Sequence, residues 1–290
     1  MSSRGRLQEV LLTMPSLLWL LLLFCLPTLI VLAIAFKPAD PLGGIGAGWT
    51  LASLRELANP NYPAIIWRTI WISFMTTALC LGLSIPMAYY LARAPRRTRT
   101  TLLLLTIIPF WTSFLIRIFA WKALLHPEGF LKQLLVWLHV ADAQTSLLYN
   151  AHAVLLVSVY TFLPFAILPI YAAAEKFDFH LIEAAMDLGA TRLRAFIKVF
   201  LPGIRRGVLN AFLMVFIPAL GSYVIPDVVG GPNGEMIGNK IAQRVFVDRN
   251  LPHASGLSAF LTIAVLLPLA GVILLQSRGG KQPPTMQEVA

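Results

Sequence analysis

SLLWLLLLFCLPTLIVLAIAF, residues 16–36, is the stretch of sequence that decides the class of this protein. It has no charged side chain, and it is long enough for a helix to cross a bilayer, which takes about 20 mostly apolar residues. The 290-residue chain is 58% hydrophobic and only 12% charged, whereas soluble domains carry about 25% charged residues. We therefore expect an all-α membrane protein with six transmembrane helices, the other five at residues 67–92, 101–125, 149–173, 207–229 and 255–275.

The distribution of Lys and Arg predicts the orientation in the membrane. The N-tail, the loops after the second and fourth runs and the C-tail hold two, four, six and two basic residues, whereas the other three loops hold two, one and three. Cytoplasmic loops are the ones enriched in Lys and Arg. Both termini and the two basic loops are therefore expected in the cytoplasm. Because the net charge of +10 follows this topology, it gives no indication of a nucleic-acid-binding patch.

These boundaries divide the chain into three parts. Residues 1–15 are expected to be a cytoplasmic N-tail, residues 16–275 a transmembrane domain, and residues 276–290 a cytoplasmic C-tail. The external loop after the first run is rich in Gly and Pro, and we expect a short surface helix near residues 51–57. The recurring prolines inside the runs, Pro109 and Pro218 among them, tend to kink their helices.

The cytoplasmic loop at about residues 174–206 carries the most informative pattern. From Glu183 to Gly207 it reads EAAMDLGATRLRAFIKVFLPGIRRG. Gly189 can adopt the left-handed conformation that closes a first helix, and Thr191 can cap a second one. The second helix carries an apolar stripe opposite its basic residues and is expected to end at Pro202; the stripe consists of Leu193, Phe196, Ile197 and Phe200. Such a helix can dock on a partner protein or lie on anionic lipid.

This segment resembles the EAA loop of binding-protein-dependent ABC import permeases. The family pattern of EAA, a following Gly and a hydrophobic–Pro pair is met by Glu183, Ala184, Ala185, Gly189, Leu201 and Pro202. In that family the loop forms coupling helices that dock in a groove of the ATPase subunit. The resemblance therefore implies an ATPase-coupling role for Glu183, Ala184, Ala185, Asp187, Gly189 and Ala190.

The resemblance extends beyond the loop and implies an assembly. PFWTSFLIRIFAWKALL, from Pro109, and IPALGSYVIPDVVGGPNGEMIG, from Ile217, look like the spermidine/putrescine branch of these permeases. Members of that branch often have an acidic residue where Ser222 follows Gly221 here. The implied partners are a second homologous permease, two ATPase subunits and an external substrate-binding protein, in the inner membrane of a bacterium.

A transport subunit of this kind is not expected to be an enzyme. The chain contains no GxxxxGK[ST] phosphate-binding loop. We expect no catalytic residue, metal or cofactor in this chain, with ATP and Mg²⁺ bound by the partner ATPase. Two other classes remain open: a secondary transporter driven by an ion gradient, for which Arg117 is the one plausible coupling group, and a membrane-embedded enzyme.

Aromatic and charged residues in the runs suggest a substrate path. Tyr223 and Asp227 lie four residues apart and are expected to share a face of the fifth helix, where an aromatic ring and a carboxylate suit an organic cation. The path candidates are Trp111, Arg117, Tyr160, Ser222, Tyr223 and Asp227. The expected solute is a small, polyamine-like organic cation; the alternative is another small solute such as an amino acid or an opine-type compound.

The topology can be tested by labelling engineered cysteines. With Cys25 and Cys80 replaced, a cysteine at Gly46 should react with an impermeant thiol reagent added outside the cell. A cysteine at Thr98 should react only when the reagent reaches the cytoplasmic side, because Thr98 lies among the basic residues of the second cytoplasmic segment. Labelling of both from outside would overturn the six-helix topology.

Overall fold

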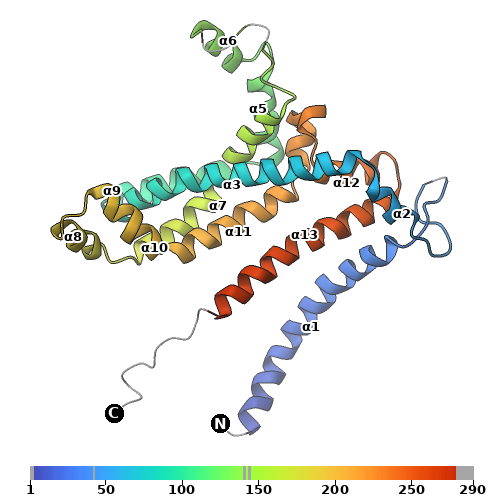
Figure 1. The fold of residues 1–290 in the computed structure, drawn as a ribbon, viewed down its shortest axis with the longest axis horizontal. Coiled ribbons are helices and arrows are strands. Elements are labelled where there is room, and N and C mark those ends of the chain that lie inside the picture. The colour runs from blue at the N-terminus through green and yellow to red at the C-terminus, as the bar shows by residue number, and fades with distance from the viewer. Residues whose placement is uncertain (1–2, 42, 140–141, 143–144, 279–290) are drawn as a thin grey trace. The chain divides into compact units, whose positions relative to one another are not determined.

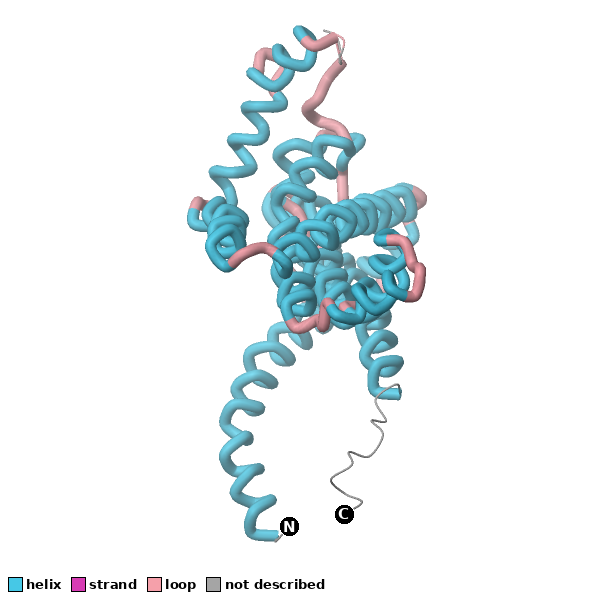
Figure 2. Tube along the Cα trace, turned by 90° about the vertical axis from the view of Figure 1, so that its left-hand side faces the viewer, coloured by secondary structure: helices cyan, strands magenta, loops and turns pink. Residues whose placement is uncertain are grey.

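The structure, a computed structural model, describes residues 3–41, 43–139, 142 and 145–278. Within these ranges the chain is helical, with no strand and one isolated bridge between Ala39 and Ile45 (Figure 1). The tube of Figure 2 shows the same described residues as helix and loop only. The helices fall into two compact units, one of residues 63–239 and one formed by the described residues up to Tyr62 and from Lys240 onward.

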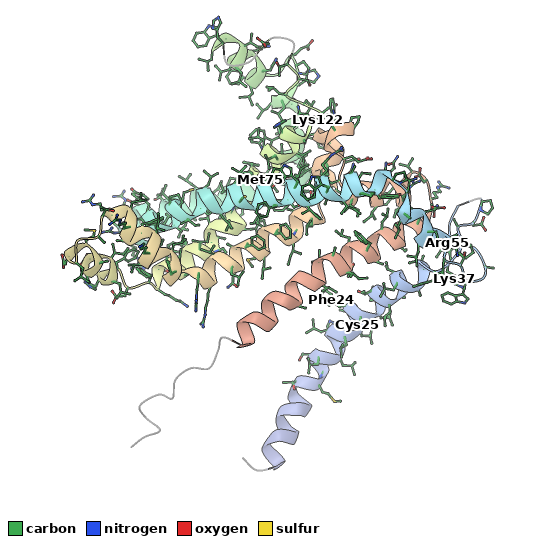
Figure 3. The ribbon with its side chains drawn as sticks, in the orientation of Figure 1. Phe24, Cys25, Lys37, Arg55, Met75 and Lys122 are labelled. Carbon is green, nitrogen blue, oxygen red and sulfur yellow. The ribbon has the colours of Figure 1, made fainter. Side chains whose placement is uncertain are left out.

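The smaller unit contains α1 (Ser3–Ile34), α2 (Ala52–Arg55), η1 (Glu56–Ala58) and α13 (Leu251–Arg278). α13 contacts α1, α2 and η1. The large apolar side chains of α1 between Met14 and Ile30, Phe24 among them (Figure 3), are exposed, as expected of a helix that has lipid as its solvent. The expected surface helix near residues 51–57 is confirmed by α2 and η1.

A buried histidine joins the segments of this unit. The side chain of His253 is 1% exposed. Its Nε2 lies 2.5 Å from the hydroxyl oxygen of Tyr62, and its Nδ1 lies 2.8 Å from a carboxylate oxygen of Glu56. This ring therefore links the start of α13 to η1 and to the first turn of α3 (Asn61–Arg93).

The larger unit is built on α3, α7 (Ala151–Glu175) and α11 (Arg205–Leu220). α7 and α11 approach closely at Gly207. A Cβ added to this residue would lie 2.4 Å from the Cβ of Ala173. Small residues at such points let two helices pack backbone to backbone. The core consists of the inner faces of these helices, with residues such as Val157, Ile167 and Val215.

The run at 101–125, expected to be one helix, is broken in the structure. α4 (Arg96–Ile107) continues into η2 (Ile108–Trp111), the chain then becomes extended, and α5 (Phe114–Leu125) and α6 (Phe130–Trp137) follow. The two helical parts meet at 92°. Pro109 has no N–H to donate, and Thr112 and Ser113 have the extended backbone torsions that stop one helix before the next begins.

The fifth run, at 207–229, is also interrupted. α11 ends at Leu220, and after a short non-helical step the chain forms the π-turn η4 (Pro226–Gly230). Next come η5 (Pro232–Gly234) and the short helix α12 (Ile237–Phe246). At its other end, the helical stretch Arg192–Gly203 meets α11 at 71°. The expectation of one continuous helix over this run is therefore wrong.

By length and composition, three helices of the described chain can each cross a membrane: Thr13–Ile34, Tyr62–Arg93 and Ala151–Glu175. Each bent pair can supply one more span, which gives up to five. α13 contributes a shorter apolar helix, Leu251–Leu266. Of the expected tails, residues 3–15 already belong to α1, and residues 279–290 of the C-tail lie outside the described residues.

Candidate functional site

The loop at 174–206 forms the expected pair of short helices. α8 (His180–Asp187) is the first, and α9 (Arg192–Ala195) begins the second. The second continues through the π-turn η3 (Phe196–Phe200) and α10 (Leu201–Gly203). Figure 1 shows α8 and α9 gathered at one end of the bundle formed by α3, α7 and α11. All of these elements belong to the larger unit.

Gly189 closes α8 with the geometry that the sequence predicts. Its φ is +88°, a conformation that strains any residue with a Cβ. The Gly189 N–H donates to the carbonyl oxygen of Met186 at 2.9 Å, and the Ala190 N–H donates to that of Ala185 at 3.0 Å. These two bonds form a Schellman motif. The Thr191 side chain then accepts a hydrogen bond from the Arg194 N–H at 3.3 Å, which caps α9 as predicted.

An aromatic cluster holds the helix pair against α3. Phe200 is 0% exposed, and its ring centroid lies 4.9 Å from that of Tyr89 on α3 and 5.2 Å from that of Phe177. Phe196 and Phe179 also pack edge-on against Tyr89. Offset and edge-to-face contacts of this kind stabilise beyond the area that they bury. The aromatic cluster therefore connects the loop to the end of a membrane helix.

The predicted apolar stripe of the second helix splits into two halves. Phe196 and Phe200 face the aromatic cluster, whereas Leu193 is 67% exposed and Ile197 50%. Leu188, in the turn between the two helices, is 90% exposed. Three large apolar side chains thus stand in solvent beside the exposed Arg192, Arg194 and Lys198. An exposed patch of this composition is typical of a surface that a partner covers.

The second helix ends at Gly203, one residue after the end that the sequence predicts at Pro202, and a 71° bend follows. The Leu201 N–H reaches back five residues to the carbonyl oxygen of Phe196. A proline in a helix interior clashes with the carbonyl four residues earlier. The wider π-turn moves that carbonyl relative to the ring, so the chain stays helical through the proline.

The EAA residues differ in their exposure. Glu183 is 61% exposed, with a carboxylate oxygen 3.3 Å from His180 Nδ1, and Ala184, Asp187 and Gly189 are also exposed. Ala185 and Ala190 are half-buried.

A pocket of about 470 Å³ lies beside α8 and α9. Among its lining residues are Glu183, Arg192 and Arg93, and the Arg93 guanidinium donates to the Tyr89 hydroxyl at 2.7 Å. The pocket lining therefore includes one carboxylate, two guanidinium groups and three aromatic rings. Sequence reasoning did not identify Tyr89 and Arg93 as site residues. The pattern that could have identified them is an aromatic residue one turn before the arginine that ends a membrane helix.

The path candidates Trp111, Tyr160 and Tyr223 make no ring contact with one another among the described residues. Trp111 is 79% exposed on η2, and Tyr160 packs edge-on against Trp121 at 5.3 Å. Arg117 lies with its guanidinium carbon 4.5 Å from the centroid of Phe110, and its Nε and Nη1 are buried without a hydrogen-bond partner in the described chain. The ring contacts among the described residues include none between Tyr223 and either Trp111 or Tyr160.

Ser222 and Tyr223 lie in the break after α11, not on a continuous fifth helix. The Asp227 N–H donates to the carbonyl oxygen of Tyr223 at 3.0 Å, so these two residues occupy neighbouring positions on one helical turn. Both of their side chains are exposed. No group of three or more His, Cys, Asp or Glu side chains suited to a metal ion occurs in the described part of the chain.

Comparison with known proteins connects this fold to a family. The model of the family "Binding-protein-dependent transport system inner membrane component" matches residues 5–278. The chain belongs to this family. It is a permease subunit of an ABC importer, a multi-pass protein of the bacterial inner membrane.

Curated relatives agree with this assignment. The spermidine/putrescine transport system permease protein PotB of Escherichia coli (strain K12) is 36% identical over 251 residues, which cover 87% of this chain and 91% of the relative. PotB of Haemophilus influenzae is 35% identical over 249 residues, 86% of this chain and 87% of the relative.

A solved bacterial ABC transporter involved in the import of the acidic polysaccharide alginate shares the fold. Its chain has a TM-score of 0.75 and 17% identity, with 96% of this chain and 97% of that chain covered. The alginate transporter in complex with its alginate pentasaccharide-bound periplasmic protein gives a TM-score of 0.72 at 16% identity, with 97% of each chain covered. At these identities the likeness concerns the fold alone.

The role of the aromatic cluster in holding the loop can be tested by removing its central ring, that of Phe200. Replacing a buried Phe by Ala costs about 3–5 kcal/mol, so Phe200→Ala should loosen the helix pair from α3. Trypsin should then cut at the exposed Arg192 and Arg194 several times faster than in the parent, measured on purified protein in detergent. Leu193→Ala, which shortens an exposed side chain of the same segment, should leave the cleavage rate unchanged. Equal rates in the parent and Phe200→Ala would show that the aromatic cluster does not hold the loop.

Proposed function

We propose that this permease carries a small, polyamine-like organic cation into the cell. The observation that carries the proposal is the likeness to spermidine/putrescine permeases at 36% identity over 87% of the chain. The exposed carboxylate of Asp227 beside Tyr223 is compatible with it, because a carboxylate attracts an organic cation and an aromatic face binds one. Ser222, without a carboxylate, should weaken selection for multiply charged solutes.

The proposed topology has six spans with both termini in the cytoplasm. Three spans are the long helices, two are the bent pairs, and α13 is the sixth. The basic residues near Arg96 and around Arg192 support a cytoplasmic location for both loops. The same topology puts Tyr223, Asp227 and the start of α13 toward the outside.

The proposed complex contains a second homologous permease, two ATPases and an external binding protein. One support is the solved alginate transporter, which was captured with a periplasmic protein. The other is the exposed surface formed by Leu188, Leu193 and Ile197 with its flanking basic residues. ATP and Mg²⁺ are then held by the ATPases, and this chain transmits the motion.

The coupling mechanism follows from how the loop is attached. Glu183 and Gly189 lie on the exposed side, where an ATPase can reach them, and Phe196 and Phe200 lie on the inner side, against Tyr89 of α3. A displacement of α8 and α9 therefore reaches the membrane helix through packed aromatic rings. Asp187, Ala184, Ala185 and Ala190 complete the proposed docking segment.

Gly189→Val and Glu183→Arg test the coupling role. The first strains a backbone at φ +88° by about 1–2 kcal/mol, and the second reverses the charge at the docking face. Both variants should insert in the membrane at the parental level. Both should lose co-purification with the ATPase, or lose the ATPase stimulation by the loaded binding protein.

Gly48→Val is the matched control, because Gly48 also has a positive φ, of +92°, and open space around its Cβ position. It lies in the loop after α1, outside the coupling segment, so its complex should keep the ATPase. Parental ATPase binding and stimulation in both coupling variants would refute the coupling role.

Asp227→Asn tests the substrate assignment. Removal of this carboxylate should lower uptake of radiolabelled spermidine at limiting concentration several-fold without loss of the complex, whereas Ser222→Glu should shift preference toward polyamines. Glu128→Gln removes another exposed carboxylate and should leave uptake unchanged. Uptake specific for an anion or for a zwitterionic amino acid, or unchanged spermidine uptake in both variants, would reject the cation proposal but not the importer assignment.

A further inference from the structure

The helix α4 is loosely attached to the rest of the larger unit. None of its residues is buried, and Leu102 and Leu103 pack against the core as partly buried side chains. The backbone is extended on both sides of this helical stretch, at Pro95 before α4 and at Thr112 after η2. A helix between two such steps can move as a rigid body. The contacts of its side chains therefore decide which part of the molecule it follows.

An ion pair fixes the first turn of α4 to the end of α7. The Arg99 guanidinium donates to a carboxylate oxygen of Glu175 at 3.0 Å, and the two residues are 76 positions apart in the sequence. Their side chains are 27% and 46% exposed. Tyr171, one turn earlier on α7, is buried, and its hydroxyl interacts with both charged groups. Three side chains from two helices thus meet at this point.

The start of α4 requires a negative charge from another element. Its first turn contains Arg96, Arg97 and Arg99 but no acidic residue, and no side chain caps it. The N-terminus of a helix carries a partial positive charge, which anions stabilise and cations destabilise. Glu175 supplies an anion from α7. The ion pair therefore answers a local electrostatic need of α4.

The carboxylate of this pair stands where the coupling loop begins. Glu175 is the last residue of α7. Two residues further on, the ring of Phe177 lies 5.2 Å from that of Phe200 and 5.4 Å from that of Phe179, within the aromatic cluster that holds the loop against α3. The junction of α7 and the loop is thus attached to α3 through aromatic rings and to α4 through charge. A displacement of the loop can reach both helices.

Stability alone gives little reason for such a pair. Water and salt screen the attraction between partly exposed charges, so pairs of this kind add little to the free energy of folding. Their attraction still selects which surfaces stay together when two elements move. A positional role fits the place of this pair, at the one end of α4 that adjoins the loop.

We propose, on the basis of the proposed coupling role of the loop, that Arg99 is a positioning residue that ties α4 to the loop through Glu175. The helical part before the 92° bend then follows the loop, and with it the ATPase, during the transport cycle. The aromatic cluster carries the same displacement to α3. Coupling between distant parts of a protein travels through such contiguous sets of packed and paired side chains.

Neutral variants of the pair test this role in proteoliposomes that contain the whole importer and its loaded binding protein. Arg99→Gln and Glu175→Gln should each lower the amount of radiolabelled spermidine taken up per ATP hydrolysed several-fold. The melting temperature of the complex and its basal ATPase rate should stay parental, because a screened ion pair adds little to stability. Arg99→Lys keeps the charge and should keep the coupling.

Arg97→Gln is the matched control. Arg97 is exposed in the same turn of α4, and the ion pairs of the described residues do not include it. Its replacement removes the same charge from the same helix end without touching Glu175. Uptake per ATP should therefore stay parental.

Exchange of the two charges tests the pairing itself. Arg99→Glu and Glu175→Arg each place like charges side by side, so each should lower uptake per ATP at least as much as the neutral variants. The double variant restores an opposite pair and should regain most of the parental value. A double-mutant cycle of this kind isolates the interaction between the two side chains from the effect of each one alone.

Spin labels measure the attachment without reference to the solute. With Cys25 and Cys80 replaced, labels are placed at Thr100→Cys on α4 and at Lys176→Cys at the start of the loop, both at exposed positions. Their separation should be the same in the resting complex and in the complex trapped with ATP and vanadate. When Glu175→Gln is added, the separation should differ between the two states.

Four results would each overturn the proposal: a state-dependent separation with the pair intact, parental uptake per ATP in both neutral variants, a lowered melting temperature that accounts for their loss, or no recovery in the double variant. If spermidine is not transported, the spin-label distances decide alone. If Gly189→Val and Glu183→Arg keep parental ATPase binding and stimulation, the coupling role of the loop fails and the proposal falls with it. If they impair coupling and Arg99→Gln does not, the positioning role alone is wrong.

Discussion

In hydrocarbon, every backbone N–H and C=O has to find its partner within the protein, and this constraint governs the whole chain. It explains why the described residues are helical and why the long helices α1, α3 and α7 can expose leucine and isoleucine freely. The exceptions are the places where a helix is interrupted. Where the helices break, after η2 and after α11, the chain bends sharply or opens into short non-helical steps. Irregular backbone at membrane depth is tolerated where protein or water covers it.

The same constraint applies to side chains. Thr69 and Thr77 satisfy it locally, through carbonyls of the preceding turn. Arg117 meets it only in part, by placing its guanidinium over the ring of Phe110. A secondary transporter would need ionisable groups inside the membrane to couple its ions, and Arg117 was the one plausible group. Membership of the binding-protein-dependent family favours energy supplied by another subunit instead of by an ion gradient coupled within this chain.

Much of the coupling loop could be predicted from sequence because its signals are local. Gly189 and Thr191 define a helix stop and a helix start by their own backbone and side-chain chemistry, and the structure has both. The division of the apolar stripe could not be predicted in this way, since it depends on Tyr89 of a distant helix. The breaks at Ser113 and Gly221 were hidden because apolar composition measures affinity for lipid and carries no information on continuity.

The π-turn at η3 has a consequence for how the docking surface can vary among related permeases. A π-turn holds one residue more than the α-helical turn that it replaces, so the residues on its two sides are offset by about 100° relative to a regular helix. In this chain the offset lies between the basic, solvent-facing start of the second loop helix and the proline that leads into α11. Loss or gain of a single residue there would rotate the arginines of α9 around the helix axis and leave the membrane helices in register. The loop therefore contains a point at which a lineage can change the direction of its proposed ATPase-docking face without rebuilding its transmembrane domain.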